Sequence, residues 1–243
     1  MKNNKFSIIT VCFNSEKTIE QTIKSVISQT YDNYEYIIVD GASTDNTLDI
    51  IKKYKDDYPD KILFISEKDN GIYDAMNKGI KMASGDIVGI INSDDWYESN
   101  ALEIINAEYN KINDYNSIVY GLLRQYKDNK FFQIKGNSHE FLKDNMIPHP
   151  TCFVPKQIYD KYGSFSLDYR IVADYELMLR FYNIPEVNFH RVEKVLANFR
   201  IGGASNGYKA TKETIRLKKK YKILSRKKEF LLKLKVFYLR FFK

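Results

Sequence analysis

The sequence predicts an α/β fold with a mainly parallel central sheet and helices on both of its faces. Three observations support this prediction. Short apolar runs alternate with helix-like spacing of apolar residues through about the first hundred positions. The apolar runs end at polar clusters, as strands do in open α/β sheets. The chain has 243 residues, 44% of them hydrophobic, which is enough to bury one substantial core.

Four strands with helices between them are expected in the first half of the chain. The strands are expected at residues 6–12, 36–39, 62–65 and 87–91. The helices are expected to follow Ser15, to run from Ser43 through Lys53, and to cover residues 72–83. Ser15 and Ser43 have the short polar side chains that cap helix N-termini. This order of elements predicts parallel strands joined by crossover helices.

The second half is less regular, but it contains recognisable elements. Strands are expected at residues 117–123, 130–135 and 192–201, and a helix at residues 173–182. Three prolines interrupt the segment around His149, which is therefore expected to be a loop. We expect one folded domain over residues 1–208, made of a first half (1–97) and a second half (98–208).

The C-terminal segment, residues 209–243, differs from the rest in charge. It holds 14 Lys and Arg against two Glu, a net charge of +12, whereas residues 1–208 carry −5. A helix is expected from Ile215 onward. One of its faces is apolar and holds Leu231, Leu234, Phe237, Tyr238 and Phe241.

Such a basic amphipathic helix is too short to span a bilayer but suits an anionic membrane surface. The alternative is a helix docked on the domain with a solvated basic face. Nucleic acid is not an expected partner, because the rest of the chain offers no basic, aromatic-lined groove. Residues 209–243 are therefore expected to hold the protein on a membrane.

The two cysteines, Cys12 and Cys152, are far apart and have no metal-ligand spacing, so they are expected to be free thiols in a reducing compartment. The N-terminus lacks the apolar segment and cleavage site of a signal peptide. No run of about 18 uncharged apolar residues is present. We therefore expect a cytoplasmic protein that lies peripherally on the inner face of the cell membrane.

Adjacent carboxylates, Asp94 and Asp95, follow the apolar run at residues 87–91. Two neighbouring carboxylates repel each other, and a cation between them removes that repulsion. Their hard oxygen atoms suit Mg²⁺ or Mn²⁺, which bind one or two carboxylates together with substrate phosphates. The structural alternative is a solvated turn that caps the next helix.

Other candidate residues have equally plain structural alternatives. Asp40 ends a strand and can either form an Asx turn or accept a hydrogen bond from a nucleobase or ribose. Asp174 can be a favourable charge at a helix start or a general base. His149 is either structural or a contact to a substrate. The sequence has neither GxGxxG after the first strand nor GxxxxGK[ST], which argues against hydride transfer and P-loop chemistry.

Four segments in a fixed order cover most of residues 6–200. They read SIITVCFNSEKTIEQTIKSVISQTYDNYEYIIVDGASTDNTLDII, EKDNGIYDAMNKGIKMASGDIVGIINSDDWY, HPTCFVPKQIYDKYGSF and VADYELMLRF. This ordered combination resembles glycosyltransferase family 2, whose members are inverting enzymes with a GT-A fold. The resemblance implies that residues 1–97 form the nucleotide-sugar donor half of a GT-A catalytic domain and residues 98–208 the acceptor half.

The resemblance also implies a role for each matching position on the donor side. Phe13 matches the aromatic residue that lies against the base, and Asp40 matches the carboxylate that binds the base, usually uracil. Asn70, Gly71 and Asn77 fall in the segment that approaches the nucleotide.

Ser93, Asp94 and Asp95 occupy the DxD-like motif, with Asp94 toward the ribose and Asp95 toward the metal. Asn92 stands where many relatives have Asp. Asp174 matches the catalytic base, and residues 202–205 resemble the family's late flexible loop.

The expected activity is therefore an inverting, metal-dependent transfer that uses Mn²⁺ or Mg²⁺. The donor is expected to be a nucleotide sugar, UDP-linked, carrying a hexose or N-acetylhexosamine. The acceptor is expected to be a saccharide on a lipid of the undecaprenyl diphosphate type, in surface polysaccharide or O-antigen assembly.

Two alternatives are a sugar-nucleotide nucleotidyltransferase and a catalytically silent sugar-binding scaffold. The first needs a Gly- and Arg/Lys-rich loop after the first strand, where this chain has CFNSEK. The second is disfavoured by the presence of Asp40, Asp94, Asp95 and Asp174.

Overall fold

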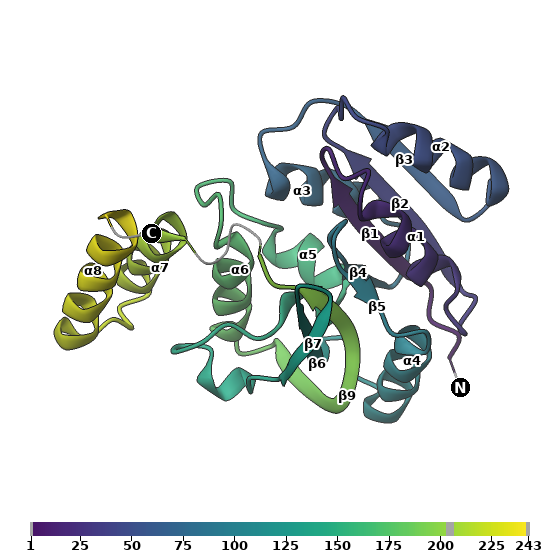
Figure 1. The fold of residues 1–243 in the computed structure, drawn as a ribbon. Coiled ribbons are helices and arrows are strands. Elements are labelled where there is room, and N and C mark those ends of the chain that lie inside the picture. The colour runs from purple at the N-terminus through teal and green to yellow at the C-terminus, as the bar shows by residue number, and fades with distance from the viewer. Residues whose placement is uncertain (1, 203–206, 242–243) are drawn as a thin grey trace.

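The computed structural model describes residues 2–202 and 207–241, and in this part of the chain the strands form one mixed sheet flanked by helices (Figure 1). The strand order along the sheet is β3-β2-β1-β4-β8-β6-β9-β5, and β7 pairs with β6. The predicted α/β class is confirmed.

The first four strands of the chain form the parallel part of the sheet. They are β1 (Phe6–Cys12), β2 (Tyr34–Asp40), β3 (Ile62–Ser66) and β4 (Ile87–Ile90). In the β1–β2–β3 register Cys12 pairs with Asp40 and Asp40 with Ser66. The carboxyl ends of these strands therefore meet at one edge of the sheet, where ligands bind in open α/β folds.

Helices cover both faces of this sheet. One face carries α1 (Ile19–Ile27), α2 (Thr47–Asp57) and α4 (Ala101–Ile112), and the other carries α3 (Ile72–Met82), α5 (Lys156–Tyr162) and α6 (Ala173–Tyr182). The period-2 alternation of β1 explains the two layers. Ile8 packs into the cluster with α1, α2 and α4, whereas Ile9 packs into the cluster with α3, α5 and α6. Both isoleucines are fully buried, and burial of each contributes roughly 1.5–3 kcal/mol.

The second half extends the sheet mostly with antiparallel pairs. Its strands are β5 (Trp96–Tyr97), β6 (Ser117–Lys127), β7 (Lys130–Lys135), β8 (Phe153–Pro155) and β9 (Asn188–Arg200), and its short 3₁₀ turns are η1 (His139–Phe141) and η2 (His149–Thr151). β8 joins the two halves, because it pairs antiparallel with both β4 and β6. Parallel pairing returns only between β6 and β9.

Two predicted helix starts are wrong, because the serines bond elsewhere. The helix expected from Ser43 begins instead at Thr47, and the Ser43 hydroxyl donates to Asp40. The helix expected after Ser15 begins at Ile19, whose N–H donates to the Ser15 carbonyl at 2.9 Å, so Ser15 contributes its backbone and not its hydroxyl.

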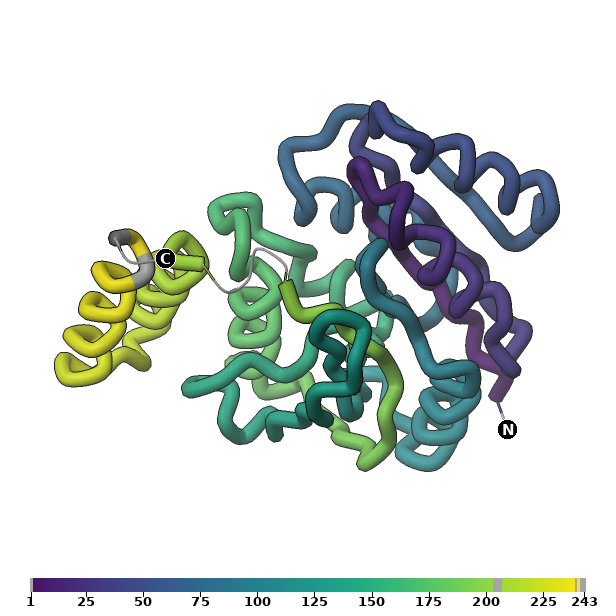
Figure 2. The backbone as a smooth tube through the Cα atoms, in the orientation of Figure 1, coloured from purple at the N-terminus to yellow at the C-terminus, as the bar shows by residue number. Residues whose placement is uncertain are grey.

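The C-terminal helices α7 (Tyr208–Lys220) and α8 (Arg226–Phe241) form a hairpin beside α6 (Figure 2). α7 packs on the domain, since Leu217 is fully buried in the core. The carboxylate of Glu213 also accepts the backbone N–H groups of Arg170 and Ile171, at 3.0 and 2.8 Å. α7 is thus joined to the segment that precedes α6.

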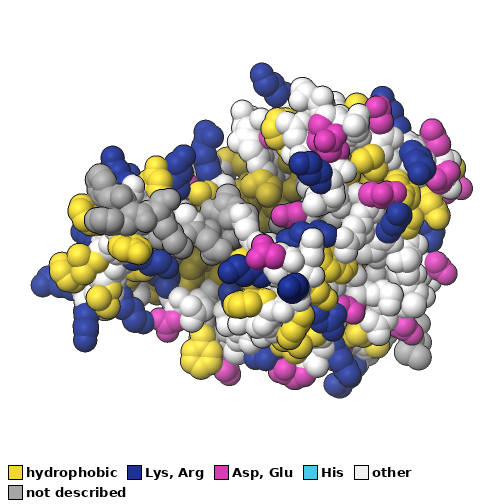
Figure 3. All heavy atoms as spheres, in the orientation of Figure 1, with side chains coloured by type: hydrophobic (Ala, Val, Ile, Leu, Met, Phe, Trp, Pro, Cys, Tyr) yellow, Lys and Arg dark blue, Asp and Glu magenta, His cyan; other side chains and the backbone are white. Residues whose placement is uncertain are grey.

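α8 exposes large apolar side chains, and Figure 3 shows hydrophobic and basic side chains together over the hairpin. These apolar side chains, each 51–62% exposed, are Phe230, Leu231, Leu234, Phe237 and Tyr238. They include the apolar face predicted from the sequence, except Phe241, whose side chain is outside the described set. Among the helices of the described residues, none combines the length and apolar character needed to cross a membrane.

Candidate active site

A cavity of about 1420 Å³ opens at the carboxyl edge of the parallel strands, where both halves of the sheet and the α7–α8 hairpin meet. Its lining includes Phe13, Ser93, Asp94, His149 and Asp174. The structure thus brings together residues that follow β1 and β4 in the first half and the start of α6 in the second half.

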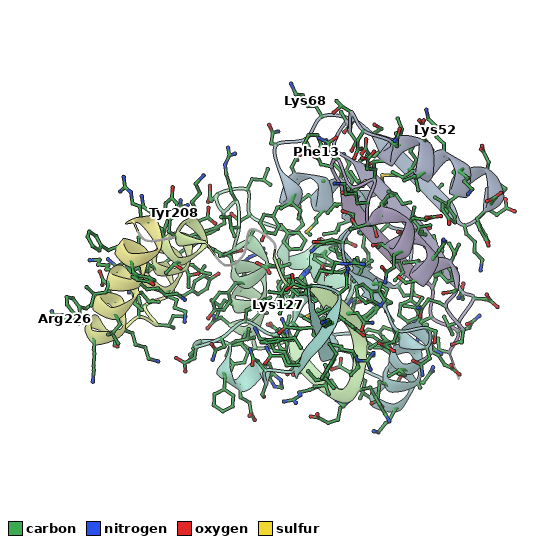
Figure 4. All side chains as sticks on the ribbon, viewed as in Figure 1. Phe13, Lys52, Lys68, Lys127, Tyr208 and Arg226 are labelled. Carbon is green, nitrogen blue, oxygen red and sulfur yellow. The ribbon has the colours of Figure 1, made fainter. Side chains whose placement is uncertain are left out.

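Phe13 directly follows β1 (Figure 4). It lines this cavity and is 61% exposed. The following residue, Asn14, has a left-handed φ of 49°. Two hydrogen bonds hold this turn: Asn14 N–H donates to Ser43 Oγ at 2.8 Å, and Thr44 N–H donates to Asn14 Oδ1 at 2.9 Å. The exposed aromatic ring therefore stands on a fixed turn and offers a flat apolar surface to a ligand.

Asp40 is fully buried and does not line the cavity. Its carboxylate accepts hydrogen bonds from Ser43 N–H at 3.0 Å, from the Ser43 hydroxyl, and from Ser66 Oγ at 2.6 Å. Internal donors thus occupy both oxygen atoms. In this conformation the hydrogen bonds of Asp40 hold the loop that contains Ser43. A nucleobase in the cavity cannot contact the Asp40 carboxylate directly, because Asp40 is fully buried.

A different carboxylate, Asp69, lines the cavity in this region. Its Oδ2 would lie 2.7 Å from a Cβ placed on Gly41, and the same Cβ would lie 3.4 Å from the Phe13 ring. Because Gly41 has no side chain, the side chains of Asp69 and Phe13 can both lie next to it. The sequence reasoning missed Asp69, although the Asp-Asn-Gly turn directly before α3 was the available signal.

The residues expected around the start of α3 divide into two groups. Gly71 lines the cavity with φ 112°, and its N–H donates to Asp69 Oδ1 at 2.8 Å. Asn70 is exposed outside the cavity lining, and its N–H donates to Asp74 Oδ2 at 2.9 Å. Asn77 is also outside the lining. Its amide makes two 2.9 Å hydrogen bonds with the backbone of Phe165, which gives it a structural role between α3 and the segment before α6.

Asp94 and Asp95 have different surroundings. Asp94 lines the cavity, and burial raises the pKa of its carboxyl above the usual value. Asp95 is fully buried, and both this burial and the neighbouring charge of Asp94 raise its pKa well above the usual value. The open carboxylate is therefore Asp94, whereas the resemblance assigned the metal primarily to Asp95.

Arg200, at the end of β9, makes hydrogen bonds to both Asp94 and Asp95. Its backbone N–H donates to Asp95 Oδ1 at 3.2 Å, and its guanidinium donates to the Asp94 carbonyl. The guanidinium also lies 4.7 Å from the centre of the Trp96 ring. The sequence analysis did not identify Arg200, because its partner Asp95 lies 105 positions away. Residues 203–206, where most of the expected late loop falls, are outside the described residues.

Two buried oxygen atoms in this strand-end segment lack a hydrogen-bond partner among the described residues: Asn92 Oδ1 and Asp95 Oδ2. Unpaired buried oxygens and two adjacent carboxylates fit a divalent cation. Across residues 2–202 and 207–241, no cluster of three His, Cys, Asp or Glu side chains could hold a metal alone. The residues present therefore fit a cation that takes the rest of its ligands from a bound phosphate group.

Asp174 is the second residue of α6 and lines the cavity from the second half of the chain. Both hydrogen bonds to its side chain reach Oδ1, from the Tyr73 hydroxyl at 3.1 Å and from Tyr175 N–H at 2.8 Å. Oδ2 accepts no hydrogen bond from the described part of the chain. The carboxylate is thus oriented by one oxygen and has the other available for a ligand.

His149 lies next to Asp174 in the same lining, held in the η2 turn against the Phe165 ring at 5.6 Å. Burial lowers the pKa of the imidazole, and the Asp174 charge opposes part of that effect. His149 is therefore neutral near pH 7 and adds a polar, uncharged group to the cavity.

The family model for glycosyl transferase family 2 matches residues 7–170. The chain belongs to this family. Among curated relatives of this glycosyltransferase, the PGL/p-HBAD biosynthesis glycosyltransferase of Mycobacterium bovis is 28% identical over 203 residues, which cover 83% of this chain and 79% of the relative. Glycosyltransferase GlyA of Streptococcus pneumoniae is 31% identical over 149 residues, which cover 59% of this chain but only 21% of the relative.

Solved structures share the fold of this family 2 protein. Staphylococcus aureus TarS 1-349 in complex with UDP matches with a TM-score of 0.66 at 21% identity, over 88% of this chain and 64% of that structure. The mannosyltransferase PcManGT from Pyrobaculum calidifontis, in complex with GDP-Man and Mn²⁺, matches with a TM-score of 0.70 at 16% identity, over 100% of this chain and 71% of that structure. The predicted GT-A fold is confirmed.

Proposed function

We propose that this glycosyltransferase moves a hexose or N-acetylhexosamine from a nucleotide sugar, UDP-linked, to a lipid-linked saccharide, with inversion at the anomeric carbon. One observation carries the proposal: Asp94, after β4 in the first half of the chain, and Asp174, in α6 of the second half, line the same cavity. A cation-facing carboxylate and a separate carboxylate with a free oxygen are the two groups that such a displacement needs. The nucleotide sugars in the solved relatives, UDP-GlcNAc and GDP-Man, support this donor class.

On the donor side, the exposed Phe13 ring would stack on the base, and Asp69, which lines the cavity, would accept a base N–H in place of the buried Asp40. Gly71 allows close approach of the backbone to the nucleotide. Ser93 Oγ is tied to Ser15 Oγ at 2.8 Å, which fixes the lining beside the nucleotide.

Asp94, which lines the cavity, would coordinate Mn²⁺ or Mg²⁺ directly. The buried Asp95 would support Asp94 without facing the cavity. The bound cation would neutralise the charge that develops on the leaving diphosphate. The Mn²⁺ in the PcManGT structure supports a metal-dependent reaction.

On the acceptor side, Asp174 accepts the proton of the attacking hydroxyl through Oδ2 while Tyr73 and Tyr175 hold Oδ1. The acceptor O–H bond breaks, a bond forms between that oxygen and the anomeric carbon, and the bond from the anomeric carbon to the diphosphate oxygen breaks. A single displacement of this kind inverts the anomeric configuration. The nucleoside diphosphate leaves with the electron pair.

The lipid-linked acceptor is supported by the hairpin. α8 combines exposed apolar side chains with Lys and Arg, a composition that suits an anionic membrane surface. The same helix lines the cavity with Leu232 and Lys235, so a membrane held by α8 would lie next to the cavity. We extend the proposal to a peripheral position on the inner face of the cell membrane and to surface polysaccharide or O-antigen assembly.

The test is a donor screen with Mn²⁺ and Mg²⁺ in which release of UDP, GDP or dTDP is measured with a synthetic diphospholipid saccharide acceptor. We expect acceptor-dependent release of nucleoside diphosphate, and its loss in the Asp94→Ala variant. Asp49→Ala, which changes an exposed carboxylate of α2, is the matched control. Release of pyrophosphate from a nucleoside triphosphate and a sugar phosphate would instead identify a nucleotidyltransferase. No release with any donor would indicate the silent scaffold.

A further inference from the structure

The charged side chains that line the cavity are distributed unevenly. The first half contributes the acids Glu16, Asp45, Asp69 and Asp94 and one base, Lys17. The second half and the hairpin contribute the bases Lys135, Arg170, Lys218 and Lys235, and the acids Asp144 and Asp174. The part of the lining that the second half and the hairpin contribute therefore has more cations than anions.

α7 directs one stripe of residues into the cavity. Ala210, Thr214 and Lys218 follow one another at four-residue spacing and all belong to the lining. Lys218 is only 9% exposed, and its ammonium donates to the carbonyl oxygen of Asp144 at 2.7 Å. Burial lowers the pKa of this lysine. Among the described residues this ammonium donates its hydrogen bond to a neutral carbonyl, so an anion brought close to it would favour its charged form.

The acids near the hairpin are already bonded to cations outside the cavity lining. Asp144 pairs with Lys228, and Glu229 pairs with Lys219 at 2.8 Å and with Lys233 at 2.6 Å. These three lysines are absent from the lining. The ion pairs of Asp144 and Glu229 are therefore made with lysines outside the lining, although the charge of Asp144 also favours the charged form of Lys218.

Arg170 and Lys235 are exposed cations of this part of the lining, as is Lys135 of β7. Neither Arg170 nor Lys235 makes an ion pair with any residue that the structure describes. The backbone N–H of Arg170 donates to the Glu213 carboxylate of α7 at 3.0 Å. Arg170 therefore belongs to the segment before Asp174 that is bonded to the hairpin. Lys235 lies one turn beyond Leu232 on α8, on the side of that helix that lines the cavity.

We propose that Arg170, Lys218 and Lys235 form a subsite for the phosphate or diphosphate that links the acceptor saccharide to its lipid. This inference rests on the proposed transferase function and deepens it by assigning residues to the acceptor's charged group. Arginine binds phosphate oxygens in a bidentate fork, and the two lysines add point charges. Leu232 and the apolar side chains of α8 lie beside this subsite and suit the lipid chain.

The test is calorimetric binding of farnesyl diphosphate to the full chain saturated with UDP and Mn²⁺, so that the donor site is filled. We expect farnesyl diphosphate to bind at least about tenfold more tightly than uncharged farnesol, and the Arg170→Gln/Lys235→Gln double variant to lose this advantage. Lys212→Gln/Lys227→Gln is the control, because it removes two exposed charges of the same hairpin that are outside the cavity lining.

If both double variants weakened the binding of farnesyl diphosphate equally, only the net charge of the protein would matter. If farnesol bound as tightly as farnesyl diphosphate, the protein would not recognise the diphosphate group. Either result would overturn the subsite. If inorganic pyrophosphate bound as tightly as farnesyl diphosphate, the site would be one for free anions and the assignment to a lipid-linked group would be wrong.

Transfer assays separate this inference from the proposed function. Failure of the wild-type protein to transfer sugar to any acceptor would overturn the function. Transfer with the same KM to a diphospholipid saccharide and to an uncharged alkyl glycoside of the same sugar would leave the function standing and refute the subsite.

Discussion

The Tyr73 hydroxyl donates a hydrogen bond to Oδ1 of Asp174 at 3.1 Å, which connects residues 101 positions apart in the chain. The same hydroxyl also donates to the carbonyl of Ile171, two residues before α6, at 2.7 Å, so its single proton is shared between the two acceptors. Tyr73 is buried and its ring stacks on Phe165 at 5.4 Å. α3 therefore fixes the orientation of the proposed base through one side chain.

Tyr73→Phe is expected to lower turnover roughly tenfold while the KM for the donor stays unchanged, because the base loses its orienting hydrogen bond but not its negative charge. The stacked ring is retained, so the fold should persist. Steady-state kinetics measure the split between kcat and KM. Tyr54→Phe is the control. It also removes a hydrogen bond from a tyrosine hydroxyl to a carboxylate, that of Glu20 at 2.8 Å, but both residues are outside the cavity lining.

Asp174→Asn is expected to lower turnover at least about 100-fold, because an amide cannot accept the proton of the acceptor hydroxyl. The change is nearly isosteric, so the melting temperature and donor binding should be close to those of the wild type. Asp168→Asn, an exposed change outside the cavity lining, serves as the comparison. Transfer by Asp174→Asn at the wild-type rate would remove this residue from the mechanism.

Asp94→Asn is expected to abolish the increase in melting temperature that UDP with Mn²⁺ produces in the wild-type protein, and to lower turnover at least about 100-fold. Asp95→Asn should keep a reduced thermal shift, because its side chain can still accept the Arg200 N–H and lies behind Asp94. Thermal denaturation with and without the metal compares the two variants. The reverse order of effects would return the primary metal role to Asp95.

Asp69→Asn is expected to raise the KM for the donor about tenfold without loss of stability, because this carboxylate lines the cavity beside Phe13. Asp40→Asn should instead lower the melting temperature, because an amide NH₂ replaces one of the two oxygens. That NH₂ cannot accept the bond from the Ser43 hydroxyl at Oδ1, or, in the other orientation, the bonds from Ser43 N–H and Ser66 Oγ at Oδ2. Kinetics and thermal denaturation of both variants assign the base contact. A large KM effect with an unchanged melting temperature for Asp40→Asn would favour the original assignment.

Glu35 provides a prediction about pH and stability. Burial alone would raise its pKa, but hydrogen bonds from Ser7, Ser84 and Lys5 outweigh burial and lower the pKa from 4.5 to about 2. A lowered folded-state pKa means that the stabilisation is present above about pH 4.5 and is lost as the pH falls through about 2. Glu35→Gln should therefore destabilise the protein near pH 7 by up to about 3 kcal/mol.

The measurement is chemical denaturation of the wild type and Glu35→Gln at several pH values between about 2 and 7. The difference in unfolding free energy should shrink toward the acidic end. Glu193→Gln, on an exposed position of β9, is the comparison. A difference that stays constant with pH would contradict the ionised state of Glu35.

Local pattern was sufficient where the contacts that form an element are close in sequence. The strands at Phe6–Cys12 and Lys130–Lys135 and the helix at Ala173–Tyr182 have the bounds that the sequence predicted. β5, α4, β8 and α5 were not predicted. β5, β8 and α5 have too few residues to show a period, whereas α4 has twelve residues with apolar side chains at helical spacing and was missed. Ser43 was misassigned as a cap, because its preferred partner, Asp40, depends on a loop conformation.

The sequence by itself determined the α/β class, the position of Asp94 at a strand end and of Asp174 at a helix start, and the basic amphipathic character of the C-terminal segment. These properties follow from apolar spacing and charge along the chain. Only the tertiary structure decided that Asp94 faces the cavity while Asp95 and Asp40 are buried. It also decided that Asp69 and the cations of the hairpin join the site. The reason is that burial and hydrogen-bond partners come from residues distant in sequence, such as Arg200 for Asp95 and Tyr73 for Asp174.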